Sequence, residues 1–145
     1  MYCSRLALTP HPSLAGDFFL QLATQPSWLK NIGDRGLKTP ADAAAYLEAG
    51  PLAKTSYAVT LKSGGAPIGI AGFLKRDFLT ERDLGFAILE AHQGQGYATE
   101  SCKALLATVP AGEAIVAIVS PANDGSIRVL VRPSLLHCPP SPLTP

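Results

Sequence analysis

Short runs that alternate apolar and polar residues, and longer runs with an apolar residue every three or four positions, divide this chain into predicted strands and helices. Residues 83–88 alternate, which predicts a strand. Residues 98–109 repeat their apolar positions at helical spacing, and Cys102, one of these positions, is expected in the core. The segment 93–97, which contains two glycines, separates them. This stretch therefore predicts a strand, a glycine loop and a helix, in that order.

Elements on the N-terminal side follow from the same patterns. Residues 4–9 alternate weakly and are followed by prolines, as an edge strand often is. Helical spacing over 14–22 predicts a first helix, and a turn or short helix with a loop follows over 28–36. A second helix is predicted over 39–50, because Thr39 can cap it, a proline follows in its first turn, and Gly-Pro ends it.

A hairpin and a C-terminal pair of elements complete the prediction. Residues 57–61 and 68–74 read as two strands joined by a Ser-Gly-Gly-Ala turn. The apolar run 114–119 predicts a buried strand that pairs in parallel, and Asn123 can cap a last helix with apolar positions within 127–131.

The glycine loop is a candidate anion site. Glycines allow positive φ and close approach of a ligand to the backbone, and the first amides of the following helix lack intrahelical partners. Phosphate is favoured at such a helix end, so residues 94–98 are predicted to seat a pyrophosphate. A Walker A loop is excluded because Gly96 is followed by Tyr97 and Ala98, and a dinucleotide fingerprint would need a third glycine near Thr99.

Composition narrows the function classes. The 145 residues are 47% hydrophobic and 16% charged with a net charge of +1, so no basic field for nucleic acid or an anionic membrane is expected. No apolar run is long enough for a membrane helix and no signal peptide is seen, which predicts a soluble cytoplasmic protein. The three cysteines and three histidines lack disulfide, zinc or triad spacing, so no metal is expected.

Two motifs give a family resemblance. Gln93, Gly96 and Ala98 match the Gln/Arg-x-x-Gly-x-Gly/Ala signature of the GNAT N-acyltransferases, and residues 121–130 are similar to the Pro-x-Asn-x-x-Ser-x-Arg-Val-Leu segment of its ribosomal-protein N-terminal acetyltransferase branch. The resemblance covers residues 4–130. It implies an α/β (α+β) fold with a mixed, mainly antiparallel central sheet flanked by helices.

The resemblance also implies a reaction and its residues. Acetyl-CoA would be the co-substrate, with its pyrophosphate on the amides of Gly94, Gln95, Gly96, Tyr97 and Ala98. Its thioester carbonyl would be polarised by a backbone amide within the segment Ala87, Ile88 and Leu89, and its pantetheine arm would lie near Asn123 and Ser126. A primary amine, on a protein N-terminus or a small molecule, would attack directly. Asp83 and Glu81 are the predicted bases, because they are the carboxylates nearest the open end of the strand.

The resemblance ends at Val131. The family continues its last helix and adds two strands, whereas residues 131–145 are proline-rich and predicted to be disordered. We therefore expect a domain over 1–130 and a tail over 131–145, as a truncation or frameshift after Leu130 would produce. Such a chain could be an inactive remnant that at most binds acyl-CoA, and an uncovered strand edge could pair with a second copy in a homodimer.

Overall fold

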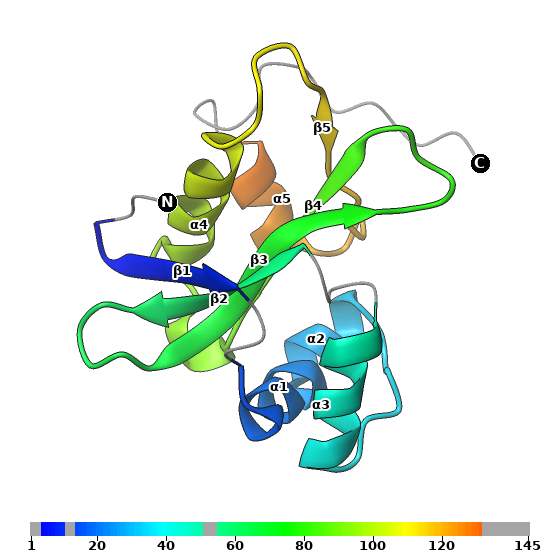
Figure 1. The fold of residues 1–145 in the computed structure, drawn as a ribbon, viewed down its shortest axis with the longest axis vertical. Helices are drawn as coiled ribbons and strands as arrows, with labels where there is room; N and C mark the ends of the chain where they lie inside the picture. The colour runs from blue at the N-terminus through cyan, green and yellow to red at the C-terminus, as the bar shows by residue number, and fades with distance from the viewer. Residues whose placement is uncertain (1–3, 11–13, 51–54, 132–145) are drawn as a thin grey trace.

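A five-stranded sheet with helices on both faces forms the protein (Figure 1). The computed structural model describes residues 4–10, 14–50 and 55–131. The elements follow in the order β1 Leu6–Pro10, α1 Gly16–Thr24, α2 Pro26–Asn31, α3 Pro40–Ala49, β2 Ser56–Leu61, β3 Pro67–Lys75, β4 Arg82–Ile88, the short 3-10 helix η2 Glu90–His92, α4 Tyr97–Leu106, β5 Ile115–Val116 and α5 Asp124–Leu130.

The sheet is mostly antiparallel. Its strands lie in the order β1-β2-β3-β4-β5, and every neighbouring pair is antiparallel except β4 with β5. Short connections from β2 to β3 and from β3 to β4 favour antiparallel pairing, whereas β4 reaches β5 through α4, a connection long enough for a parallel pair. The predicted hairpin, the mainly antiparallel sheet and the parallel last pair are confirmed.

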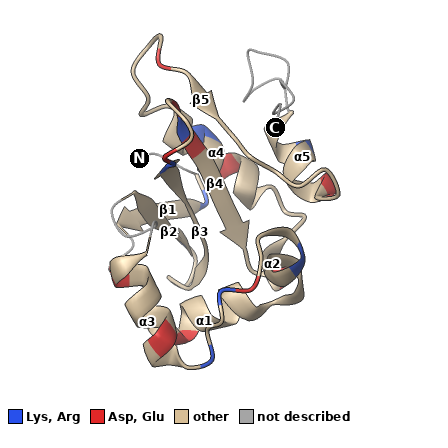
Figure 2. Cartoon of the chain, turned by 90° about the vertical axis from the view of Figure 1, so that its right-hand side faces the viewer, with Lys and Arg blue, Asp and Glu red and all other residues tan. Residues whose placement is uncertain are grey.

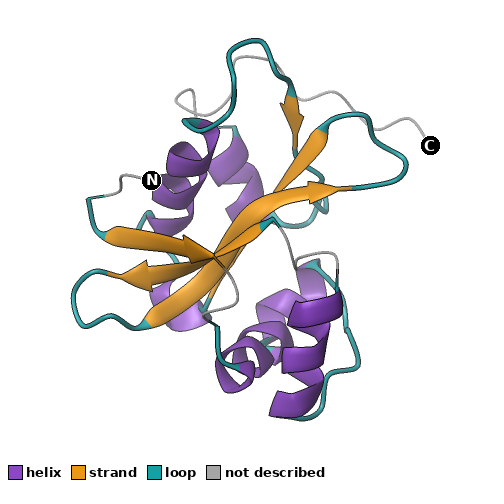
Figure 3. Cartoon of the chain, viewed as in Figure 1, coloured by secondary structure: helices purple, strands orange, loops and turns teal. Residues whose placement is uncertain are grey.

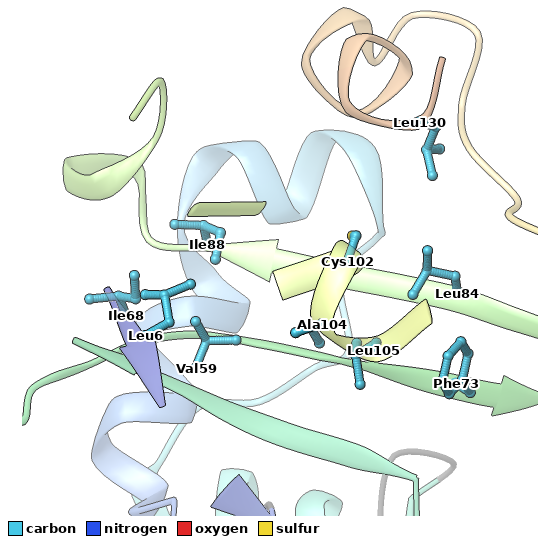
Figure 4. Close-up of a cluster of buried hydrophobic side chains, with 11 residues drawn as sticks. Leu6, Val59, Ile68, Phe73, Leu84, Ile88, Cys102, Ala104, Leu105 and Leu130 are labelled. Atoms are coloured by element: carbon cyan, nitrogen blue, oxygen red, sulfur yellow. The ribbon is translucent and has the colours of Figure 1, made fainter. Parts of the chain in front are cut away.

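The larger core lies between the sheet and α4. Leu6, Val59, Ile68 and Leu84 from the strands pack with Cys102 and Leu105 of α4, and each of them is almost inaccessible to solvent (Figure 4). Leu130 of α5 joins the same cluster. The apolar stripe predicted for the helix after the glycine loop is therefore the surface that buries the sheet. Because α4 packs on the sheet, the position of its N-terminus, next to the glycine loop, is fixed relative to the sheet.

A second core lies under the three N-terminal helices. Phe19 and Leu22 of α1, Trp28 of α2 and Leu47 of α3 pack with Ile70 of β3. Phe19 stacks on Tyr46 at 5.7 Å and meets Trp28 edge-on at 5.8 Å between ring centroids. The three helices form one group beside one end of the sheet (Figure 3). This packing places α2 against β3 near Ile70.

Three boundary predictions are corrected by the structure. The predicted buried strand 114–119 is a two-residue strand, β5, whose side chains are only half-buried. The helix after the glycine loop ends at Leu106, so Val109 lies beyond it while still packing on the core. Val131 follows α5 and is exposed. The predicted tail lies, apart from Val131, outside the described residues.

Candidate functional site

The glycine loop presents an uncapped helix start. Gly94 and Gly96 have φ of 78° and 84°, in the left-handed region that favours glycine, and Gly96 is the N-cap of α4. No side chain caps the helix, and the first intrahelical bond runs from the Glu100 amide to the Gly96 carbonyl. The amides of Tyr97, Ala98 and Thr99 precede that bond and are left for a ligand. The arrangement can bind an anion of phosphate type.

Arg5 fastens this loop to the start of β1. Its Nη1 donates to the Gln95 carbonyl at 2.9 Å, its Nε pairs with Glu100 Oε2 at 2.8 Å, and its guanidinium lies 4.5 Å from the centre of the Tyr97 ring. Burial alone would raise the pKa of the Glu100 carboxyl, but hydrogen bonds and charge from Arg5 outweigh it and hold that pKa below its ordinary value. Sequence reasoning missed Arg5, because 90 residues separate it from Gln95.

A groove of about 590 Å³ begins at the loop and runs along β4. Strands β4 and β5 pair only at Arg82 with Ile115 and at Asp83 with Val116, and then diverge. The groove is lined by residues of the glycine loop, α5, α2 and β3, as well as of β4 itself. Of the predicted site residues it brings together Asp83, Ala87, Ile88, Gln93, Gly94, Gly96, Tyr97, Ala98, Asn123 and Ser126.

Along β4, alternate amides face β3 and the open side. The Leu89 amide donates to the Ile68 carbonyl at 2.8 Å, so it is taken up by the sheet. Because alternate amides of a strand point the same way, the Ala87 amide also faces β3. The Phe86 and Ile88 amides face the diverging side. Of the predicted segment 87–89, Ile88 is the residue with an amide directed to the groove, and Phe86 is a position that sequence reasoning missed.

Side-chain amides tie the end of β4 to the loop and to α2. The Ile88 carbonyl accepts from Gln93 Nε2 at 2.9 Å and from Gln25 Nε2 at 3.0 Å. Gln25 also accepts from the Glu90 amide, and the Glu90 carboxylate accepts from the Ser27 amide at 2.7 Å. The predicted cofactor residue Gln93 therefore uses its side chain to hold the loop. Gln25 and Glu90 were not predicted, since nothing in their local sequence indicates this contact.

Asp83 occupies the fork between β4 and β5. Its side chain is 2% exposed, its Oδ2 accepts from Arg76 Nε at 2.6 Å, and its Oδ1 accepts from the Ile118 amide at 3.1 Å. Both oxygens are thus engaged in joining the β3–β4 connection to the segment after β5. This geometry favours a structural role over the general-base role predicted from sequence. The residue still lines the groove, so the two roles can be separated by experiment.

Glu81, the other predicted base, lies outside the groove. Glu81 lies just before β4 and is not among the described residues that line the groove. A hydrogen bond from the Thr80 side chain, its own backbone amide and the charge of Lys75 lower the pKa of the Glu81 carboxyl from its ordinary value, which makes it a weaker base. His92 lines the groove beside the loop. Cys102 is buried as expected, and burial raises the pKa of its thiol to about 12, so it is not a thiolate nucleophile.

Asn123 and Ser126 form the N-terminal cap of α5. The Asn123 side chain accepts from the Ser126 amide at 3.2 Å, which confirms the predicted cap, and both residues line the groove.

Over the described ranges, no group of three or more His, Cys, Asp or Glu side chains is arranged to hold a metal. Within those same ranges no helix is both long and apolar enough to cross a bilayer.

Comparisons of the sequence and the structure with known proteins find similar acetyltransferases. The family model for the acetyltransferase (GNAT) domain matches residues 5–132. A GnaT-family acetyltransferase from Bordetella pertussis is 26% identical, with a TM-score of 0.66 over 90% of this chain and 84% of that one. An acetyltransferase from Agrobacterium tumefaciens is 24% identical, with a TM-score of 0.66 over 89% and 78%. A GNAT-family acetyltransferase from Bacillus anthracis is 18% identical, with a TM-score of 0.69 over 90% and 79%. A search of curated protein sequences finds no significant match.

Proposed function

Because the chain belongs to the GNAT acetyltransferase family, which implies acyl transfer from acyl-CoA, we propose that it transfers an acetyl group from acetyl-CoA to a primary amine. The observation that carries the proposal is the combination of an uncapped, glycine-bounded helix start with a groove that continues from it along β4. A pyrophosphate on the loop amides would leave the rest of the co-substrate free to extend along that groove.

Each wall of the groove has a distinct part in the proposed reaction. The amides of residues 94–98 bind the pyrophosphate, and Asn123 and Ser126 lie where the pantetheine arm passes. The Phe86 or Ile88 amide donates to the thioester carbonyl oxygen, which gains negative charge during attack. The amine nitrogen then bonds to the carbonyl carbon, the carbon–sulfur bond breaks, and the departing sulfur takes up, through solvent, the proton that the nitrogen loses.

A binding function without catalysis is the second candidate. It is favoured by one observation: among the described residues the groove has a single carboxylate, Asp83, and that carboxylate is already bonded to Arg76 and to the Ile118 amide. A domain of this kind would bind acyl-CoA and transfer nothing.

A thiol-release assay separates the two candidates. Acetyl-CoA is incubated with the protein and a mixture of primary amines, and free thiol and acetylated amine are measured together. We expect thiol release that depends on added amine, with one acetylated product formed for each thiol. Tight acetyl-CoA binding with no amine-dependent release would instead support the binding function.

A further inference from the structure

One part of the groove is walled by the N-terminal helices. Here its wall is α2 and the loop that follows, with Trp28, Asn31 and Arg35 among the lining residues, and Tyr46 of α3 lies beside them. Gly72 and Gly85 pair in register on β3 and β4 and also line the groove. We take this part of the groove as the entry side of the acceptor, and this assignment rests on the proposed function.

The charged side chains that line the groove are predominantly positive. They are Arg35, Lys75, Arg76 and Arg128, with Asp83 as the one carboxylate among the described residues. Arg76 is paired with Asp83, and Lys75 donates to the carbonyls of Leu79 and Thr80 at 2.8 Å. In the part of the chain that the structure describes, Arg35 forms no ion pair. The neighbouring Asp34 carboxylate accepts from the Gly36 amide.

Trp28 adds a second donor without a partner. The residue is 4% exposed and lines the groove, and its buried Nε1–H has no hydrogen-bond acceptor in the described structure. A buried donor left unsatisfied costs about 1–3 kcal/mol, and an ordered water is one group that can satisfy it. An uncompensated guanidinium and an unsatisfied indole N–H therefore occur on one helix and the loop that follows it.

We propose that the acceptor is a small amino-acid-like molecule whose amine is accompanied by a carboxylate, and that Arg35 receives the carboxylate. A guanidinium binds a carboxylate through two parallel hydrogen bonds, and such charge-assisted bonds hold the neighbouring amine in a fixed position. Polyamines and lysine-rich peptides are disfavoured, because they bring only positive charge to a wall that is already positive.

The experiment compares matched acceptors in the thiol-release assay. Each standard amino acid is tested against its carboxamide and its decarboxylated amine, with spermidine added to the panel. We expect kcat/KM for the best amino acid to exceed that for its amide by roughly tenfold or more, as one charged hydrogen-bonded contact provides. Arg35→Gln should bring that ratio towards one, chiefly by raising KM for the acid.

Lys30→Gln provides the matched control, since Lys30 is an exposed cation of α2 that does not line the groove. It should leave the acid-to-amide ratio unchanged. Preference for the amide, the decarboxylated amine or spermidine, or an unaltered ratio in Arg35→Gln, would overturn the inference while leaving acetyl transfer intact. Absence of release with every amine would overturn the proposed function, and the inference with it.

Discussion

Arg5 shows how a single side chain can position a binding loop built from distant sequence. Its three contacts join the first strand to the Gln95 carbonyl, the Tyr97 ring and the Glu100 carboxylate. The guanidinium is about half exposed, so each contact alone is weak. Together they restrict the loop whose amides are proposed to bind the pyrophosphate, and an ordered loop loses less entropy on binding.

Replacing Arg5 with Gln is expected to weaken CoA binding roughly tenfold, about 1.4 kcal/mol, because the loop then has to be ordered on binding. Titration calorimetry measures the change. Arg82→Gln is the matched control, since Arg82 also makes an exposed ion pair, with Glu113, and also lies 4.5 Å from an aromatic ring, that of Phe73. Equal loss of affinity in both variants would show that Arg5 has no special relation to the loop.

Residues with a local signature were predictable, and residues defined by distant contacts were not. Asn123 was identified as a cap from its place before a helix, and Cys102 as a core residue from its place in an apolar stripe. Arg5 and Gln25 carry no such pattern, because their partners lie 90 and 63 residues away. Asp83 was located near the groove, but its bonds to Arg76 and Ile118 depend on how the two strands diverge.

The pairing of β4 with β5 depends on the Asp83 link, since only two residue pairs connect these strands. Asp83→Asn removes the charge that Arg76 requires, and losing such a buried hydrogen-bonded contact costs about 1–3 kcal/mol, or a fall in Tm of roughly 5 °C. We expect that fall in calorimetry, together with a pH–rate profile of unchanged shape. An unchanged Tm with the pH dependence abolished would restore Asp83 as the general base.

Strand boundaries show where sequence patterns stop being informative. The run 114–119 is apolar throughout, which indicated a buried strand, yet only Ile115 and Val116 pair with β4. An apolar run records that side chains are partly covered, and not whether the backbone is hydrogen-bonded. The strands of the hairpin were predicted well because both a turn and an alternating pattern define them, and the register with β4 follows from these.

Over the whole molecule, charged residues of both signs are dispersed along the chain, so the site does not arise from a strong overall field (Figure 2). The layers follow from the sequence, because each helix carries one apolar face and the sheet needs cover on both sides. The groove could not be predicted from the sequence. It exists because β4 and β5 diverge while α2 and α5 lie on opposite sides of the gap, an arrangement set by packing between distant elements.

Titration of CoA into Gly96→Val tests the central claim most directly, because Gly96 lies at the N-cap of α4 with φ of 84°. Gly112→Val is the matched control: Gly112 has φ of 87°, open space around it and a position beyond α4, so it imposes the same backbone strain away from the loop. We predict that both variants fold, that Gly112→Val binds CoA like the parent, and that Gly96→Val shows no measurable binding. A folded Gly96→Val protein with the parent's affinity would contradict the assignment of this loop as the CoA site.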